Sequence, residues 1–405
     1  MIKFTLFLYT NLAILFCGFT QSTWVNYTPA NSGVKSTVRA LEIDHQNRIW
    51  IGYEWSAPGL TLYDGNSWTT IDTSNGLSDN RVHVIFEDNS NNIWIGTQNG
   101  LDKFDGINWT TYTTIDGLVY NYVISIYQDT NNNLWFGTVN GVSKFDGINW
   151  TNYSVSDGLA NNYVYAISQD NQGDMWFTYG LNASGATKFN GVNWTTYTTT
   201  DGLISNQVNT ILCDHLGNLW FGCYGLSAGI SMFDGITWTS YPSGNGPACH
   251  NVWTSKEDSQ NRLWFGTSCH GGTSMYNYSN WTIFDTTNSG IVSNNILEIA
   301  EDTSGNIWFG GYDGLSKFSN VNSIINENIS FEDIKIFPNP TNGEINIVGQ
   351  KFENVEIINL HGQIVKKTDV LNEKVKIDVS NLSNGFYTLR IKTIDGIITK
   401  KFVKE

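Results

Sequence analysis

Ten residues with side chains suited to ligand recognition stand outside the regular pattern of this 405-residue chain. They are Tyr53, Glu54, Trp55, Tyr179, Asn182, Tyr224, His250, Trp253, His270 and Tyr312. Exposed aromatic rings stack on sugar rings, while Asn, Glu and His side chains hydrogen-bond to hydroxyl groups. We therefore expect a binding rim for a glycan or a peptide. The alternative is that long loops tolerate such residues and that Trp253 only packs.

Signatures of catalysis are missing from the sequence. It has no His-Glu-x-x-His helix and no phosphate-binding loop. No nucleophile and base stand in a convincing arrangement. We predict no catalytic residue, no cofactor and no metal site. The alternative is a hydrolase or lyase whose site lies on the face that carries the long loops described below.

The elements that must position the rim repeat along the chain. Seven tryptophans follow Ile, Leu or Met at intervals of 41 or 44 residues: Trp50, Trp94, Trp135, Trp176, Trp220, Trp264 and Trp308. A second tryptophan precedes each of them by 26 or 27 residues: Trp24, Trp68, Trp109, Trp150, Trp194, Trp238 and Trp281. Repeats of this length with four short strands each are typical of propeller blades.

The second unit shows the four expected strands: residues 81–88, 92–97, 100–105 and 108–113, with a hairpin turn at Asp105-Gly106. Because Trp24 supplies the outer tryptophan that the seventh unit lacks, the N-terminal segment Thr23–Tyr27 should close the ring. We predict an all-β fold with a seven-bladed β-propeller over residues 23–320, leaving no free strand edge.

Residues found once in every blade are more simply explained as scaffold than as a site. An aspartate lies six residues before each first tryptophan: Asp44, Asp88, Asp129, Asp170, Asp214, Asp258 and Asp302. Seven carboxylates could suggest metal sites, but an Asp side chain also caps a turn by accepting backbone N–H groups. We expect the turn role for the aspartates, and blade packing for the fourteen repeated tryptophans.

The blades differ mainly in the loop between the second and third strands. From the first tryptophan to the glycine that opens the third strand is 6 residues in three blades and 8 or 9 in the others. These loops share a face with the connections between blades, and such loops commonly carry ligand sites. The ten rim residues lie there or nearby.

Four cysteines follow the N-terminal leader: Cys213, Cys223, Cys249 and Cys269. An even number in an exported chain favours disulfides. The blade register places Cys249 and Cys269 at neighbouring ends of two paired strands, which predicts a bridge between them. His250 and His270 adjoin this pair, so a metal site is the less favoured alternative.

The two ends of the chain differ from the repeats. Residues 1–22 have a basic start and a short apolar core, as in a cleaved secretory signal peptide. No later stretch is long and apolar enough to span a membrane. Residues 23–330 carry 10 Lys and Arg against 27 Asp and Glu, which argues against a nucleic-acid partner. A polar linker over residues 321–330 leads to residues 331–405, whose alternating patterns predict a small Ig-like β-sandwich.

The repeat unit, clearest in Ile296–Phe318 with its "GNIWFG" and "GLSKF" segments, resembles the two-component regulator propeller repeat. The resemblance covers residues 23–320. It implies an extracytoplasmic sensor-type propeller of a kind often thought to bind glycan fragments. The chain has none of the transmembrane, kinase and response-regulator parts of those regulators, so we expect the propeller to act as a free or surface-bound module.

Residues 331–405 resemble the type A C-terminal sorting domain of the type IX secretion system. The matching residues are Pro338, Asn339, Pro340, Gly362, Gly385, Tyr387, Lys400 and Lys401. The resemblance implies passage through the periplasm to the outside of the cell, with the type IX secretion machinery as a partner. We expect a secreted or cell-surface binding module, with an enzyme or a structural, adhesive protein as the alternatives.

Overall fold

A computed structural model describes residues 23–35, 37–54, 58–225, 228–319, 335–348, 352–359, 364–369, 374–393 and 396–405. The predicted signal peptide and the predicted linker lie outside these residues. The chain divides into two compact units, residues 1–323 and residues 324–405. All regular structure in the described ranges is β, and they contain no helix that could cross a membrane.

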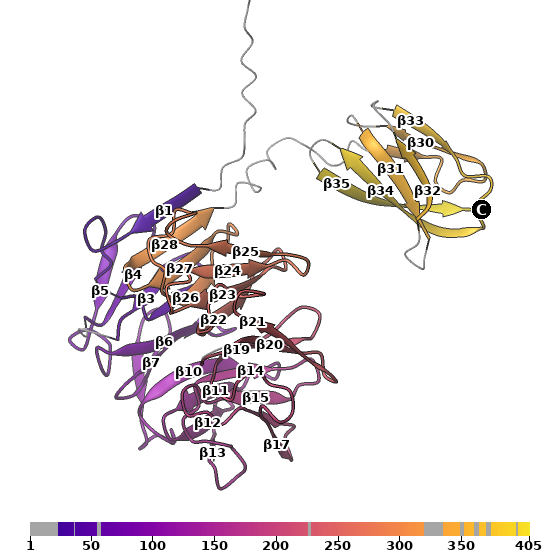
Figure 1. Ribbon diagram of the computed structural model, residues 1–405. Coiled ribbons are helices and arrows are strands. Elements are labelled where there is room, and N and C mark those ends of the chain that lie inside the picture. Colours follow the sequence, from indigo (N-terminus) through magenta and orange to yellow (C-terminus); the bar gives the residue numbers. More distant parts are fainter. Residues whose placement is uncertain are drawn as a thin grey trace, which may run out of the picture. The chain divides into compact units, whose positions relative to one another are not determined.

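The first unit consists of seven antiparallel four-stranded sheets, each forming one blade (Figure 1). The innermost strands are β2 (Ala40–Ile43), β6 (Val82–Glu87), β10 (Val123–Gln128), β14 (Ala166–Gln169), β18 (Val208–Cys213), β22 (Val252–Glu257) and β26 (Ile296–Glu301). The second strands are β3 (Ile49–Gly52), β7 (Ile93–Thr97), β11 (Leu134–Thr138), β15 (Met175–Thr178), β19 (Leu219–Cys223), β23 (Leu263–Thr267) and β27 (Ile307–Gly311).

The other two strands of each blade lie progressively further out. The third strands are β4 (Leu60–Tyr63), β8 (Leu101–Phe104), β12 (Gly141–Phe145), β16 (Ala186–Phe189), β20 (Gly229–Phe233), β24 (Thr273–Tyr276) and β28 (Gly314–Ser319). The outermost strands are β5 (Trp68–Ile71), β9 (Trp109–Tyr112), β13 (Trp150–Tyr153), β17 (Trp194–Tyr197), β21 (Trp238–Pro242), β25 (Trp281–Phe284) and β1 (Thr23–Tyr27).

The N-terminal strand completes the last blade, as predicted. β1 pairs with β28 over its whole length, from Thr23 opposite Ser319 to Tyr27 opposite Leu315. The two strands lie side by side in Figure 1 although they come from opposite ends of the propeller sequence. Asn26 stabilises this strand pairing. Its side-chain amide donates to the Gly290 carbonyl at 2.9 Å, and its Oδ1 accepts from Ser316 Oγ at 2.7 Å.

The glycine of the repeated Trp-x-Gly motif lets neighbouring blades approach closely. A Cβ added to Gly52 would lie 2.5 Å from Cγ1 of Val82, at the start of the next innermost strand. The same contact closes the ring, since a Cβ on Gly310 would lie 2.5 Å from Cγ1 of Val38. Any larger residue at these positions must push the adjoining blade away.

The repeated aspartates close the turns between the first and second strands, as predicted, and have a second role that the sequence analysis missed. Each accepts hydrogen bonds from the backbone N–H groups two and four residues later, as Asp88 does from Ser90 and Asn92. Each also accepts the indole N–H of the tryptophan six residues later, at 2.7–2.9 Å in all seven blades. A buried indole N–H needs such an acceptor.

The hairpin turns between the third and outermost strands differ in detail from the prediction. In the Asp-Gly turns only the glycine has a positive φ, 96° at Gly106, and the central residues are Gly106 and Ile107, which fits a type II′ turn; in the sixth blade Tyr278 takes the same position with a φ of 63°. Asp105 instead caps the turn by accepting from the N–H groups of Ile107 and Asn108.

The second unit is a two-sheet β-structure with one core. One sheet has the order β29 (Lys335–Phe337), β30 (Glu344–Val348), β33 (Lys374–Asp378). The other has the order β32 (Ile364–Asp369), β31 (Phe352–Ile358), β34 (Gly385–Thr393), β35 (Gly396–Lys404). Ile345 and Ile347 from the first sheet share a buried cluster with Ile357, Leu389 and Ile391 from the second.

Candidate functional site

At the start of every innermost strand, a constant residue is followed by a variable one. The constant residues are buried aliphatics, at most 1% exposed: Val38, Val82, Val123, Val164, Val208, Val252 and Ile296. The variable residues, which we call the mouth ring, are Arg39, His83, Ile124, Tyr165, Asn209, Trp253 and Leu297. All seven lie five residues before the turn aspartate, so the scaffold presents seven different side chains at one equivalent position.

The strand pairing explains why these side chains point away from their own blade and toward the centre of the ring. In five blades the mouth-ring residue is skipped in the strand pairing; in β6, Val82 pairs with Thr97 and Val84 with Gly96, while His83 has no partner. Such β-bulges re-aim a side chain and are common beside functional sites. In the other two blades, Arg39 and Tyr165 directly precede the strand.

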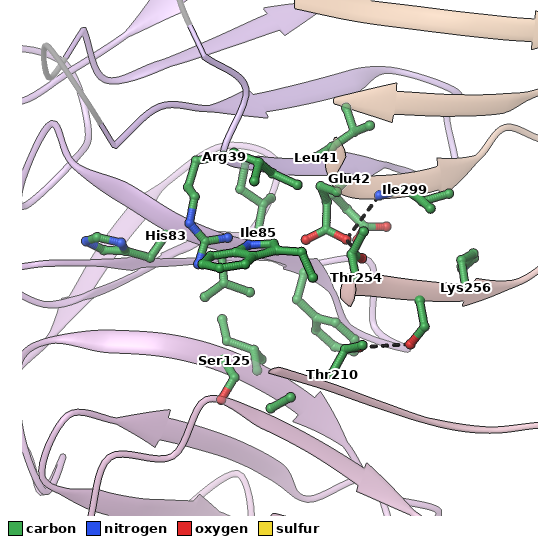
Figure 2. A pocket seen from close by; sticks show the side chains of 18 of the residues that line it. Arg39, Leu41, Glu42, His83, Ile85, Ser125, Thr210, Thr254, Lys256 and Ile299 are labelled. Carbon is green, nitrogen blue, oxygen red and sulfur yellow. Dashed lines mark hydrogen bonds between the residues drawn. The ribbon is translucent and has the colours of Figure 1, made fainter. Parts of the chain in front are cut away.

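Six mouth-ring residues line a cavity of about 370 Å³ at the loop end of the innermost strands, here called the mouth cavity. Its remaining walls are Glu54, Tyr122, Tyr163, Leu181 and Asn182. A second cavity of about 330 Å³, the channel cavity, is lined by residues of all seven innermost strands and shares the same six mouth-ring residues with the first. Figure 2 shows the channel cavity, with Arg39 and His83 toward one end and Glu42 and Lys256 toward the other.

Arg39 is the most firmly held side chain of the mouth cavity. Its Nε donates to Glu54 Oε2 at 3.2 Å and its Nη2 donates to the Tyr165 hydroxyl at 3.2 Å. The guanidinium carbon lies 5.9 Å from the centre of the Trp253 ring, within cation–π distance. Burial alone would lower the pKa of Arg39, but nearby Tyr165, Glu54 and Glu298 outweigh it and raise the pKa, so the group stays cationic.

Two nitrogens of the mouth ring are buried and have no hydrogen-bond partner among the described residues: His83 Nε2 and Trp253 Nε1. His83 is 4% exposed, and its Nδ1 lies 3.9 Å from Glu54 Oε1. Burial, with help from Arg39 and Arg81, lowers the pKa of His83 to about 3, so the imidazole is neutral at physiological pH. Buried polar atoms without partners are rare, and they point to a ligand that satisfies them.

Aromatic rings form much of the wall around these groups. Tyr165 meets Trp253 edge to face, with ring centres 5.8 Å apart, and stacks with Tyr163 at 6.4 Å. Tyr122 lies 4.5 Å from the His83 ring. Burial raises the pKa of Tyr122 and of Tyr165 to about 12, so both hydroxyls keep their protons and can donate.

Two of the glutamates that line the channel cavity, Glu42 and Glu298, have shifted pKa values. Burial raises the pKa of Glu42 to about 8, with Glu298 and Glu87 adding to the effect and Lys256 opposing it. Burial also raises the pKa of Glu298, whose Oε1 accepts from Thr254 Oγ1 at 2.9 Å.

The structure brings together three of the ten predicted rim residues. Glu54, Asn182 and Trp253 line the mouth cavity. Tyr224, His250, His270 and Tyr312 are not among its lining residues, although they lie on the same loop face. Trp55 lies outside the described residues.

For Tyr53 and Tyr179 the prediction of exposed binding side chains was wrong. Both are 0% exposed. The Tyr53 hydroxyl donates to Thr61 Oγ1 and accepts from the Lys35 N–H, and the Tyr179 hydroxyl makes the equivalent bonds to Thr187 and Ala160. Each ring folds back into its own blade because the hydroxyl finds partners there.

The sequence analysis missed most of the cavity, including Arg39, His83, Tyr122, Tyr163, Tyr165 and Asn209. A signal for the mouth ring was present. When the seven repeats are aligned on the turn aspartate, a position that is always Val or Ile precedes one that changes from blade to blade.

Cys249 and Cys269 form a disulfide in the structure, with their Cα atoms 6.2 Å apart. The bridge joins the connection before β22 to the loop between β23 and β24. The two sulfurs and a ring nitrogen of His250 lie within 4.8 Å of one another, but bonded sulfurs are not the thiolates that a metal requires. Cys213 and Cys223 are free thiols, and burial raises the pKa of each.

The residues of the predicted sorting signature connect the ends of the C-terminal unit. Asn339, between Pro338 and Pro340, donates to the Lys401 carbonyl at 3.2 Å and accepts from the Val403 N–H at 2.9 Å. Tyr387 is 9% exposed and its hydroxyl donates to the Ser383 carbonyl. Gly385 begins β34, Lys400 and Lys401 lie in β35, and Gly362 lies outside the described residues.

Comparisons with known families agree with this architecture. The model of the two component regulator propeller matches residues 76–99, 117–140, 158–179, 202–225 and 290–313. The model of the secretion system C-terminal sorting domain matches residues 335–405. A comparison with curated proteins finds no match.

Three solved structures illustrate the likeness. The extracellular domain of BT3049 from B. thetaiotaomicron, described as part of a hybrid two component system, is 19% identical with a TM-score of 0.65; the match covers 95% of this chain and 57% of that one. PorZ, a surface component of the type-IX secretion system of Porphyromonas gingivalis, is 20% identical with a TM-score of 0.56, covering 92% and 60%. A streptogramin B lyase is 15% identical with a TM-score of 0.59, covering 74% and 97%.

At these identities the neighbours establish the fold, and the chain spans less than two thirds of BT3049 and PorZ. The sorting domain implies interaction with the type IX secretion machinery and a location outside the cell. The chain is thus a secreted or cell-surface protein that carries two-component regulator propeller repeats and ends in a type IX secretion system C-terminal sorting domain.

Proposed function

We propose that the propeller is a binding module that takes a glycan into the mouth cavity. The observation that carries this proposal is the mouth ring, where one structural position holds different side chains in a ring of otherwise repeated blades. A scaffold needs no such variety, whereas a site that contacts an asymmetric ligand does.

The chemistry of the cavity wall suits a sugar. Tyr163, Tyr165 and Trp253 offer rings for stacking against the C–H faces of a pyranose. Arg39, Trp253 and the tyrosine hydroxyls donate hydrogen bonds, and Glu54 and the amide oxygen of Asn182 accept them. Sugar hydroxyl groups both donate and accept, so they can satisfy such a mixed wall.

The proposal is tested by applying the secreted chain to an array of neutral and acidic oligosaccharides. Trp253→Ala and Tyr163→Ala should each weaken binding of whichever glycan is retained. Tyr312→Ala is the matched control, because Tyr312 is 51% exposed on the same face but does not line the cavity. Binding that survives both cavity substitutions, or retention of peptides alone, would contradict the proposal.

An enzyme with its site in the adjoining channel cavity is the second candidate. The supporting observation is Glu42, because a carboxyl whose pKa is raised to about 8 keeps its proton at neutral pH and could serve as a general acid. Analysis of the array ligands for cleavage products separates the two functions. Intact ligand supports a binder, cleavage supports a hydrolase or lyase, and neither binding nor cleavage leaves an adhesive role.

A further inference from the structure

We propose that the mouth cavity recognises the carboxylate of an acidic sugar, through the outer edge of the Arg39 guanidinium. This inference rests on the proposed glycan-binding function and names the class of glycan. Uronic acids are a class of sugars that combine a pyranose ring with a carboxylate.

The first argument is the unused hydrogen-bonding capacity of Arg39. A guanidinium has five N–H groups in a planar fork. The contacts present in the described residues use two of them, one from Nε to Glu54 and one from Nη2 to Tyr165. Both N–H groups of Nη1 and one of Nη2 have no partner among the described residues, on a side chain that is 11% exposed. That edge is the one that binds a carboxylate through two parallel hydrogen bonds.

The second argument is that the fork is held in place before any ligand arrives. Glu54 holds the Nε side, the Tyr165 hydroxyl holds Nη2, and the Trp253 ring lies against the guanidinium. Glu54 approaches through one oxygen at Nε and leaves the outer edge clear. An arginine fixed on three sides loses little conformational entropy on binding.

The third argument comes from the neighbouring nitrogens. Trp253 Nε1 is buried, lacks a partner in the described structure and can only donate. His83 is only 4% exposed, and its Nε2 also lacks a partner among the described residues. A carboxylate has about four lone-pair sites and no proton to place, so it can accept from Arg39 and Trp253 together. A hydroxyl group accepts less and needs an acceptor of its own.

The local charge favours one negative charge on the ligand over two. The charged groups that line the mouth cavity are Arg39 and Glu54, because the imidazole of His83 is neutral. A monoanion paired with Arg39 leaves Glu54 as the only excess charge. A phosphate dianion would place a second negative charge close to Glu54, in a domain that is already acidic.

The experiment compares acids with their neutral esters on the secreted chain. The probes are oligosaccharides of galacturonate, glucuronate and mannuronate, each beside its methyl ester, with affinity measured by isothermal titration calorimetry. At least one acid should bind roughly tenfold or more tightly than its ester, the usual size of a well-formed arginine–carboxylate contact. Arg39→Lys keeps the charge but removes the fork, and should abolish that preference.

Matched variants separate recognition from folding. Arg81→Lys is the control, because Arg81 lies two residues from His83, is paired with Asp79 and lines neither cavity. It should retain the full preference for the acid. Should Arg39→Lys fold poorly by circular dichroism, Trp253→Phe keeps an aromatic ring but removes the indole N–H together with the five-membered ring, and it should lower affinity for the acid more than for the ester.

Each outcome decides between the two proposals. Equal affinity for acids and esters, both lost in Trp253→Ala, would overturn the carboxylate assignment and leave glycan binding standing. A preference for the acid that survives both Arg39→Lys and Trp253→Phe would also overturn the assignment. Binding of neutral array glycans alone would do the same, and binding of no glycan would overturn both proposals.

Discussion

The two ends of an innermost strand differ in what they tolerate. At the turn end, all seven blades place an aspartate that accepts bonds from two backbone N–H groups and a tryptophan. At the mouth end, five residues earlier, the seven blades place seven different side chains. Two of these, His83 and Trp253, have ring nitrogens that lack partners in the described structure. Polar groups repeated and satisfied in every blade maintain the ring, whereas those that vary and stay unsatisfied are available to a ligand.

The largest effect should come from removing the strand that completes the ring. A chain beginning at Thr28 lacks β1, so β28 becomes an exposed edge. Phe309 and Phe318 also lose the Trp24 ring that packs against them. We expect aggregation or loss of cooperative unfolding, measured by size-exclusion chromatography and thermal denaturation. Val25→Thr is the control, since Val25 is 45% exposed in the same strand. A stable monomer without β1 would show that the scaffold does not depend on closure.

The comparison is tested most directly by substitutions at the two ends of one strand, β6. Asp88→Ala leaves the buried Trp94 N–H and two backbone N–H groups unpaired, and should lower the free energy of unfolding by about 4 kcal/mol. His83→Ala removes a side chain whose Nε2 has no partner among the described residues, and should cost less than about 2 kcal/mol. Urea denaturation measures both. Equal costs would remove the distinction between the two ends.

The disulfide stabilises the loops on the same face of the propeller as the mouth cavity. The described residues on the opposite face, where the turn aspartates lie, contain no disulfide. The double variant Cys249→Ser, Cys269→Ser should lose about 3 kcal/mol, from the entropy of a loop with a sequence separation of 20. Cys213→Ser should change stability little, because Cys213 is a partly exposed free thiol. Peptide mapping without reduction checks the pairing itself, and a bridge from Cys249 or Cys269 to any other cysteine would refute it.

The smallest effect concerns pH. Unfolded Glu42 ionises near its ordinary pKa of 4.5, whereas burial raises the folded pKa to about 8. Between these values the folded state binds more protons, so the free energy of unfolding should fall as pH rises through this window. Glu42→Gln should flatten the decline and raise the free energy of unfolding at pH 8. Glu344→Gln, at a half-exposed position of the C-terminal unit, should leave the pH profile unchanged.

The repeated half of this comparison was predictable because seven copies of the same pattern reinforce one another. The spacing of Trp50, Trp94 and their equivalents placed the strands, and Trp24 revealed the closure. The aspartates were assigned to turns correctly, but their bond to a tryptophan six residues away depends on the register of two strands, which spacing alone does not determine.

The site was harder to predict because it depends on where side chains point. Tyr53 and Tyr179 lie in long loops, yet each hydroxyl finds a partner inside its own blade, and nothing in the local sequence distinguishes a ring that turns inward from one that turns outward. Arg39 and His83 fall in strand-like segments and resemble ordinary strand residues. For His83 the bulge after the buried Val82 directs the side chain into the cavity, whereas Arg39 directly precedes its strand.

The pairing of β1 with β28 also bears on how the protein withstands mechanical force. Any tension transmitted from the C-terminal unit enters the propeller at Ser319, the last residue of β28. That strand is flanked by β27 on one side and β1 on the other, so peeling it away breaks two hydrogen-bond ladders at once, whereas an edge strand would be held by one. A propeller tethered through its C-terminus at a cell surface would therefore resist shear at the point where the strain is applied.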